Sequence, residues 1–455
     1  MTTRRLLVAG VVGSTLVAVG GWGSGALPPG TSGRGPGTPL VLIGVLLLSA
    51  AWWRLRERAG RAALLWSVPL LLAPPMFSRD VYAYAGQAAL VVEGLDPYAV
   101  GPAERPGPLA DGVDDVWRDT PSPYGPLWLA LAGLVVRTTG DRLVPALVGM
   151  RCLAVLGLVL AGWALLRLGG ERALWLGLAN PLVLLHLLAG AHNEALMLGL
   201  ALAGLAVCRG GSPGRVAAAA VLVTLGALVK LPVVAVLPFV VMAVPGGWPA
   251  RARAAAVAAA AAAVTAALVT LVSGLGWGWL GTLDAGRARL SLFSVTTGLG
   301  LLLPGGAAAL DAALVAGVLV GAGTAAVLLW RTPRLGAPRA AGLALLAVAL
   351  LLPVVQPWYV LWGVLPLAAA AGPRLAAAVG ALCLVLCLLV WPSGRSVVRP
   401  PLHGLPTLLA VAAATQVWRA GPVPWSPADA PDGLAGRSGP VRTRRRPERP
   451  SRRGR

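Results

Sequence analysis

The chain has 455 residues, of which 57% are hydrophobic and only 12% are charged, and its formal net charge is +21. Soluble domains carry about a quarter charged residues, so this composition excludes an ordinary water-soluble domain. The basic residues lie between apolar runs and in the C-terminal tail, a distribution that indicates membrane topology rather than nucleic-acid binding.

Apolar runs recur from Leu6 to Trp418, separated by short segments with Arg, Gly or Pro. Because such runs can cross a hydrocarbon core of about 30 Å, residues 1–418 are predicted to form an all-α, polytopic transmembrane bundle of about 13 to 15 helices. The helices are expected near residues 6–27, 39–53, 62–77, 143–167, 172–189, 194–208, 215–229, 232–245, 254–273, 309–330, 338–354, 357–372, 375–391 and 404–418. By the positive-inside rule, the arginines of the loops place both termini in the cytoplasm.

A stretch rich in Pro, Gly and Asp, residues 78–124, follows the third expected helix and carries eight acidic residues but three arginines. We predict that it is a long first extracytoplasmic loop. The next apolar run, 125–136, gives about 18 Å of helix, which is too short to span, so we interpret it as a re-entrant helix. The tail, 419–455, is rich in Arg and Pro and is predicted to be a disordered, basic, cytoplasmic segment.

Asp80 stands just after the third apolar run, at the mouth of the predicted loop. A carboxylate in this position can accept a proton from an incoming hydroxyl, which makes Asp80 a candidate general base. An interfacial aspartate paired with Arg79 is the structural alternative.

Aromatic residues and carboxylates are interspersed along the same loop. Sugars are recognised by such sets, because their C–H faces stack on rings while their hydroxyls need acceptors. The candidate sugar or acceptor ligands are Tyr82, Asp96, Tyr98 and Tyr124. An interfacial aromatic belt would have the same composition.

Lys230 is the only lysine among the 38 Lys and Arg residues, and it lies between two expected helices. A compact cation there suits a phosphate ligand, although a lysine that extends its ammonium group to the membrane interface is an alternative. Arg287 and Arg289 lie in a predicted exterior loop, against the positive-inside rule, so they are candidate ligands for the same phosphate.

Further polar residues are expected at the exterior ends of helices. These are His192, Asn193 and Glu194 at one helix junction, and Gln356 and Tyr359 at another. They are candidate ligands for sugar or acceptor oxygens, with a structural histidine as the alternative reading of His192. No metal-ligand pattern, Walker loop, dinucleotide fingerprint or Ser/His/Asp order is present, so no cofactor is expected, and a need for a divalent cation is left open.

With these residues, the chain resembles the GT-C glycosyltransferases, and in particular the actinobacterial α-1,6-mannopyranosyltransferases that use polyprenyl-phosphate mannose to build lipomannan. The stretches that carry the resemblance are Asp80-Val81-Tyr82-Ala83-Tyr84, Gly94-Leu95-Asp96-Pro97-Tyr98, Trp117 to Pro126, Asn180-Pro181 through His192-Asn193-Glu194, Lys230-Leu231-Pro232 and Gln356-Pro357-Trp358-Tyr359. They occur in order over roughly residues 60–400. Glu194 departs from the aspartate expected after His-Asn.

The resemblance implies a GT-C-like fold and an enzyme of the cell envelope, a polyprenyl-phosphate-mannose-dependent mannosyltransferase. Asp80 would be the base, and an acceptor hydroxyl would attack the anomeric carbon, inverting it and releasing polyprenyl phosphate. The implied partners are polyprenyl-phosphate mannose, an α-1,6-mannan or glycolipid acceptor and the lipids of the plasma membrane, with no nucleic acid. The active site would face the extracytoplasmic side.

Two other functional classes share parts of this pattern. A transporter or flippase for a lipid-linked sugar would also have many helices and a basic patch, but such proteins usually show paired halves with polar sites at mid-membrane. A membrane scaffold without catalytic activity would explain the helices but not the concentration of polar residues at one face.

Overall fold

The computed structural model describes residues 2–27, 35–55, 57–282 and 291–421. Within these ranges the chain forms helices of the α, 3-10 and π types and no β-strand, apart from a single bridge between Val390 and Ser396. The predicted all-α class is thus confirmed. Of the predicted C-terminal tail, only residues 419–421 fall in the described part of the chain.

The first three helices form one corner of the bundle. They are α1 (Thr3–Gly21), α2 (Thr38–Arg54) and α3 (Ala59–Leu71). Glycines let α1 and α2 pack closely, since a Cβ on Gly13 would lie 2.9 Å from the carbonyl oxygen of Gly44. The third helix ends at Leu71 rather than near residue 77, because Pro74 and Pro75 cannot continue it.

The segment predicted as a long loop, 78–124, is largely ordered and contains a 13-residue helix. Its elements are α4 (Asp80–Val92), η1 (Pro102–Glu104), α5 (Pro108–Asp111) and α6 (Asp115–Arg118), and α7 (Pro126–Thr139) follows. The sequence did not predict the helix at residues 80–92, and the extracytoplasmic location of the segment stays a prediction. Ten of the residues of α4 are buried, from Val81 to Leu90, so the helix is held by packing on both sides. The short helix expected near 125–136 is present as α7.

The middle of the chain forms a long helix, a broken pair and a hairpin. The elements are α8 (Leu143–Leu176), the π-helix η2 (Val183–Ala189), α9 (Glu194–Val207) and α10 (Pro213–Ala227). Gly170, with φ 66° and ψ −156°, kinks α8 and separates its last residues. The expected single helix over 172–189 is wrong, because non-helical residues separate α8 from η2.

The following elements connect α10 to the C-terminal helices. They are η3 (Leu231–Ala235), α11 (Val236–Met242), α12 (Trp248–Ser273), η4 (Gly278–Leu280) and α13 (Val295–Leu302). The Ala-rich α12 is 26 residues long, and only four of its residues are buried.

The last elements complete the bundle. They are α14 (Gly306–Trp330), α15 (Thr332–Leu335), α16 (Ala337–Leu351), η5 (Pro357–Val360), α17 (Leu361–Ala368), α18 (Pro373–Cys387) and α19 (Leu405–Ala420). Gly317 and Gly321 are the buried residues of α14, and a Cβ on Gly317 would lie 2.8 Å from the carbonyl oxygen of Leu351. Glycine therefore allows α14 to pack directly on the backbone of α16.

Four described helices, α1, α8, α12 and α14, are long and apolar enough to cross a membrane. The pair η2 and α9 adds a fifth if the two are counted as one span bent by 112°. The remaining apolar helices have 10–17 residues, short of the roughly 20 that a span needs. The chain is a membrane protein, but 13 to 15 full spans are not confirmed.

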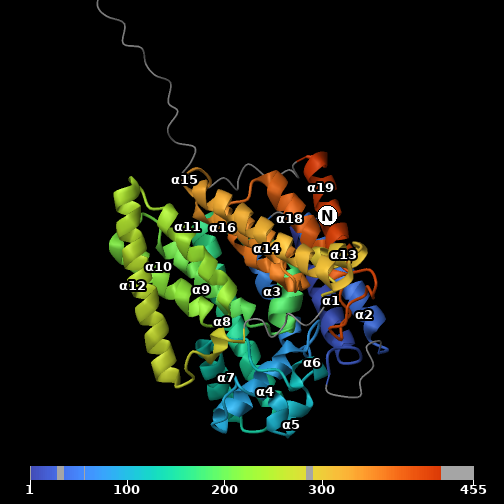
Figure 1. The fold of residues 1–455 in the computed structure, drawn as a ribbon. Coiled ribbons are helices and arrows are strands. Elements are labelled where there is room, and N and C mark those ends of the chain that lie inside the picture. Colours follow the sequence, from blue (N-terminus) through green and yellow to red (C-terminus); the bar gives the residue numbers. More distant parts are fainter. Residues whose placement is uncertain (1, 28–34, 56, 283–290, 422–455) are drawn as a thin grey trace, which may run out of the picture.

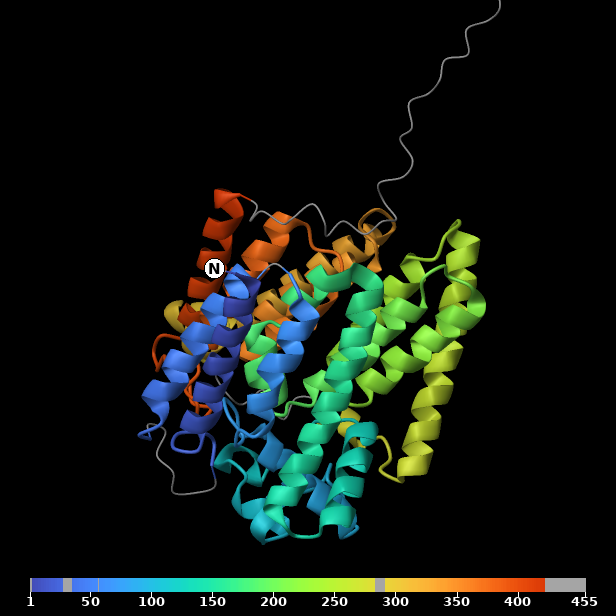
Figure 2. The ribbon, with the colours of Figure 1, turned by 180° about the vertical axis from the view of Figure 1, so that it is seen from behind.

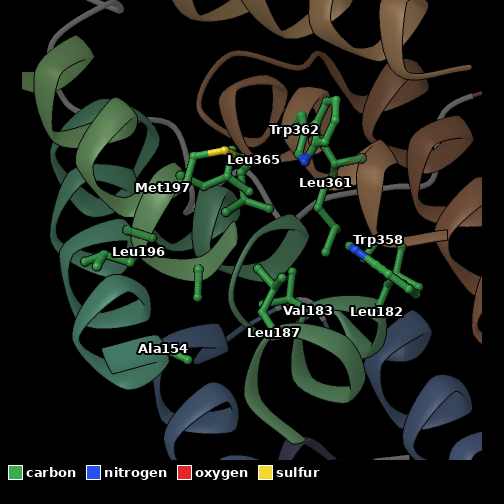
Figure 3. Packing of buried hydrophobic residues seen from close by; sticks show 14 of the residues in the cluster. Ala154, Leu182, Val183, Leu187, Leu196, Met197, Trp358, Leu361, Trp362 and Leu365 are labelled. Atoms are coloured by element: carbon green, nitrogen blue, oxygen red, sulfur yellow. The ribbon is translucent and has the colours of Figure 1, made fainter. Parts of the chain in front are cut away.

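Figure 1 shows that α4, α5, α6 and α7 gather at the lower end of the molecule, while α15 lies at the upper end. The view from behind shows the same separation (Figure 2). Between these ends, buried apolar side chains join the two halves of the chain. In Figure 3, Met197 of α9 lies next to Leu365 of α17, and Trp358 of η5 lies next to Leu182, just before η2.

Candidate active site

Four ionisable side chains converge where several helices begin or end. The Nδ1 atom of His192 lies 3.5 Å from Oδ2 of Asp80 and 3.5 Å from Oε2 of Glu194. The other carboxylate oxygen of Glu194, Oε1, accepts a hydrogen bond from the ammonium group of Lys230. The four side chains form a continuous row of contacts from Asp80 to Lys230. They therefore lie close together, as predicted from the sequence.

Asp80 is the first residue of α4, and 16% of its side chain is exposed. Its backbone N–H donates to Oγ of Ser78 at 3.0 Å. Burial raises the pKa of Asp80 above its ordinary value of 3.8, although His192 and Lys230 oppose the shift. The carboxyl group is therefore a stronger base than an exposed aspartate, and it remains accessible.

Arg79 does not pair with Asp80. Its guanidinium group donates to the backbone oxygen of Leu27 and lies 6.0 Å from the ring of Tyr82. The alternative reading of Asp80 as half of an interfacial Asp–Arg pair is therefore wrong, and its carboxylate is turned toward His192 instead.

His192 and Glu194 lie at the sharp break between η2 and α9. The break has a strained backbone, because Ala191 adopts a positive φ of 53°, which residues with a Cβ rarely do. It is also crowded: a Cβ on Gly190 would lie 2.5 Å from the carbonyl oxygen of His186. This turn places His192 and Glu194 beside Asp80, and both side chains are fully buried.

Lys230 follows the C-terminus of α10. At this point the N-terminus of α7 donates hydrogen bonds to a backbone oxygen at the end of α10. The N–H groups of Leu127 and Trp128, at the start of α7, donate to the backbone oxygen of Leu228 at 3.1 and 3.3 Å. Such N–H and C=O groups have no partner within their own helices. Gly125 makes the approach possible, since a Cβ there would lie 2.2 Å from that oxygen.

Aromatic rings enclose the ammonium group of Lys230. It lies 4.8 Å from the ring centroid of Tyr359, 5.6 Å from that of Tyr124 and 5.9 Å from that of Trp362. Burial lowers the pKa of Lys230, but Glu194 outweighs that effect, and the net shift is upward. The ammonium group of Lys230 is therefore paired with a buried carboxylate inside the protein, and the reading of a lysine extended to the membrane interface is wrong.

Several buried polar atoms in or next to this row of four side chains have no hydrogen-bond partner among the described residues. They are both ring nitrogens of His192, both amide atoms of Asn193 and Oε2 of Glu194. A buried polar group without a partner costs about 1–3 kcal/mol. Substrate hydroxyl or phosphate oxygens could supply the missing partners, which makes these atoms candidate substrate ligands.

The other predicted ligands differ in their placement. Tyr124 and Tyr359 line the site, whereas Tyr82 packs on the opposite side of α4, where a Cβ on Gly112 would lie 2.5 Å from its ring. Asp96 is exposed and accepts a hydrogen bond from the backbone of Tyr98 at 2.9 Å.

Tyr98 in turn packs against Gly278, and Gln356 immediately precedes η5, the element that carries Tyr359. Arg287 and Arg289 lie outside the described residues. The structure therefore brings together seven predicted residues: Asp80, Tyr124, His192, Asn193, Glu194, Lys230 and Tyr359.

Two residues that were named from the sequence within longer stretches, but not as site residues, also shape the site. Tyr84, one turn after Asp80, packs edge-on against Tyr124 at 5.2 Å, and its hydroxyl oxygen accepts the backbone N–H of Asn193 at 3.5 Å. Trp358 packs on His192 with ring centroids 4.2 Å apart. The helical spacing between residues 80 and 84 would have revealed Tyr84 if α4 had been predicted.

Comparisons with known proteins identify the family. Residues 7–246 match the model of the alpha-(1->6)-mannopyranosyltransferase N-terminal domain, and residues 289–420 match the model of the MptB C-terminal domain. The chain belongs to the alpha-(1->6)-mannopyranosyltransferase family. The first of these matches alone covers more than half of the chain.

Curated members of the family are similar to the chain over most of its length. A probable alpha-(1->6)-mannopyranosyltransferase of Mycolicibacterium smegmatis is 35% identical, in a match that covers 81% of this chain and 79% of the relative's length. An alpha-(1->6)-mannopyranosyltransferase of Mycobacterium tuberculosis is 35% identical over 80% and 78%. Alpha-(1->6)-mannopyranosyltransferase B of Corynebacterium glutamicum is 32% identical over 80% and 72%. No solved structure matches the chain.

Proposed function

We propose that the chain is an inverting mannosyltransferase, which moves mannose from polyprenyl-phosphate mannose to an α-1,6-mannan or lipoglycan acceptor at the extracytoplasmic face of the membrane. The observation that carries the proposal is the partly exposed carboxylate of Asp80. It lies next to the buried charged side chains and to polar atoms that have no hydrogen-bond partner among the described residues. Membership of a mannosyltransferase family supports the sugar and the linkage.

Asp80 acts as the general base in this proposal. It accepts the proton of the acceptor hydroxyl while that oxygen forms a bond to the anomeric carbon of mannose. At the same time the bond between the anomeric carbon and the phosphate oxygen breaks, and its electron pair leaves with polyprenyl phosphate. The raised pKa of Asp80 suits this role, because base strength rises with pKa.

Stabilisation of the leaving phosphate needs more positive charge than Lys230 supplies. Glu194 already balances Lys230, although an ammonium group with three N–H donors can also bind a phosphate oxygen. Arg287 and Arg289 are the proposed additional cations. Both flanks of their segment are fixed near the site: Thr282 donates to the backbone oxygen of Ser122 at 2.7 Å, and Ser291 donates to that of Val355 at 2.6 Å.

The sugar has suitable partners among the residues around Asp80 and Lys230. Tyr124 and Tyr359 present rings to C–H faces, while His192 and Asn193 have nitrogen or oxygen atoms without partners among the described residues. Trp358 fixes the ring of His192 from behind. Direct roles for Tyr82, Asp96, Tyr98 and Gln356 stay predictions.

The membrane side follows from the arginines at the opposite end of the α9–α10 hairpin. Arg209 and Arg215 flank the turn, and the 14 residues of α9 separate them from Glu194 by about 20 Å. By the positive-inside rule we expect this turn, like both chain termini, to lie on the cytoplasmic side, and the Asp80 end to face the exterior.

The deciding experiment is a transfer assay on the full chain in reconstituted vesicles with labelled polyprenyl-phosphate mannose and an α-1,6-oligomannoside acceptor. We expect a new α-1,6 linkage, and Asp80→Asn should lower the rate by about 10²–10⁴-fold without loss of folded protein. Polyprenyl-phosphate glucose as the donor tests the specificity for mannose, and added Mg²⁺ or a chelator tests the need for a divalent cation. Movement of the labelled lipid without product, or full activity of Asp80→Asn, would contradict the proposal.

A further inference from the structure

A second charged site lies far from Asp80. It is a pocket of about 370 Å³ lined by Trp163, Arg167, Ala206, Val207, Arg209 and Arg215, which we call the arginine pocket. Three of these six residues are cations, and none of the three forms an ion pair in the described part of the chain. The acidic residue nearest in sequence, Glu171, accepts a hydrogen bond from the backbone of Gly60 instead.

Backbone oxygens hold two of the three arginines, and the guanidinium group of Arg167 lies 5.8 Å from the ring centroid of Trp163. Arg209 donates from Nη1 to the carbonyl oxygen of Arg167 at 2.6 Å, and Arg215 donates from Nη1 to that of Arg209. The turn between them needs glycine, because Gly210 has a φ of 94° and a Cβ there would lie 2.6 Å from Nη1 of Arg215. Each guanidinium group has five N–H donors, so most of them remain available to a ligand.

The arginine pocket is separate from the candidate active site. The helix α9 begins with Glu194 at the active site and ends with Ala206 and Val207 at the pocket, about 20 Å away. The helix α10 then returns from Arg215 toward Lys230. A ligand in the pocket therefore cannot be the sugar phosphate that Lys230 would bind.

Both the charge and the position of the pocket point to a lipid. Three like charges held together repel one another unless an anion binds, and guanidinium groups bind phosphate with paired hydrogen bonds. Beside them, α8 exposes the apolar side chains of Val159, Trp163 and Leu166, and α8 is long enough to span a membrane. Tryptophan at the end of such a surface is typical of the level of lipid headgroups.

We propose that the arginine pocket binds the phosphate of an anionic phospholipid headgroup, on the membrane face opposite to Asp80. The guanidinium groups contact the phosphate, Trp163 borders the glycerol region, and the acyl chains lie along α8. This binding does not depend on the proposed enzymatic reaction.

The test compares the full chain in nanodiscs of phosphatidylcholine alone and of phosphatidylcholine mixed with phosphatidylglycerol. Lipids retained after extraction are counted by native mass spectrometry. Wild type should retain phosphatidylglycerol about tenfold better than phosphatidylcholine, and the combined variant Arg167→Gln, Arg209→Gln and Arg215→Gln should lose that preference. Equal retention by wild type and this variant would overturn the proposal.

Arg251→Gln is the matched control. Like Arg167 beside Trp163, Arg251 lies over a tryptophan ring, that of Trp248, at 5.7 Å. It has a general attraction to anionic lipid but is not part of the arginine pocket. It should keep the preference for phosphatidylglycerol. Inorganic phosphate, added to protein in a neutral detergent, separates the two sources of phosphate: thermal stabilisation equal to that given by phosphatidylglycerol would contradict a lipid ligand.

Discussion

The two ends of the α9–α10 hairpin have similar numbers of charged residues nearby, but these residues are buried and paired at one end and exposed at the other. At the active-site end, Lys230 and Glu194 are paired, and Glu194 is fully buried. At the other end, Arg167, Arg209 and Arg215 are exposed and form no described ion pair. The first end resembles a preorganised site that excludes water, and the second an open site for an anion.

The physical reason is the cost of removing charge from water. A buried charge must be paired, because an uncompensated one is strongly unfavourable, whereas an exposed arginine is stabilised by solvent or by a mobile anion. Mutations should therefore affect folding at the active-site end and ligand binding at the arginine end. Four predictions test this difference.

The largest effect is expected at the buried pair. Lys230→Met leaves the carboxylate of Glu194 without its partner and should lower the free energy of unfolding by about 3–5 kcal/mol. The double variant Glu194→Gln with Lys230→Met should recover most of this loss, since no isolated charge remains. Chemical unfolding in micelles measures both, and equal instability of the two variants would show that the pair is not the cause.

A smaller effect is expected where α7 meets α10. Gly125→Ala pushes a methyl group against the carbonyl oxygen of Leu228, and should destabilise the protein by about 1–3 kcal/mol and slow transfer by displacing Tyr124. Gly214→Ala, at the arginine end of α10, is the control: its Cβ meets no atom within 4 Å, so stability should not fall. A stable and active Gly125→Ala would argue against this junction as the positioning element.

The pH dependence should differ between the two ends. Asp80 is active when deprotonated, and its pKa is raised above 3.8, so activity should be lost as pH falls, starting at a higher pH than for an exposed aspartate. Ser78→Ala removes an interaction that lowers this pKa, and should therefore move the loss to still higher pH. Lipid preference at the arginine pocket should stay constant over the same range, because guanidinium groups do not titrate there. Rate profiles in reconstituted vesicles would show an acid limb that Ser78→Ala leaves in place if this assignment is wrong.

The smallest effect on folding is expected in the arginine pocket. Arg209 is exposed, so Arg209→Gln should change the free energy of unfolding by no more than about 0.5 kcal/mol. Chemical unfolding in the neutral detergent used for Lys230→Met gives the direct comparison. A loss as large as that of Lys230→Met would mean that both ends serve folding alike.

Much of the architecture could be predicted from local sequence. Helices expected over 194–208 and 404–418 appear as Glu194–Val207 and Leu405–Ala420, because apolar composition and flanking glycine or proline define both ends. Helix α4 was not predicted, since its small and aromatic residues lack the length and uniform hydrophobicity of a span. Without this helix, there was no reason from the sequence to place Tyr84 on the same face as Asp80.

The candidate site shows the same division. Asp80, His192, Glu194 and Lys230 stand out in the sequence because ionisable side chains next to apolar runs are costly. Their mutual distances could not be predicted, because the residues come from three separate helix junctions. The enclosure of Lys230 by Tyr124, Tyr359 and Trp362 also depends on how α7, η5 and α17 pack.

The sequence by itself determined the membrane class, the resemblance to mannosyltransferases and the identity of the charged candidates, because hydrophobicity and rare residue types are local properties of the chain. Only the tertiary structure decided that Glu194 neutralises Lys230, that His192 lies between two carboxylates, and that three arginines meet in one pocket. Those relations depend on the angles at which helices break and cross, and these angles are set by packing between distant segments rather than by any single run of residues.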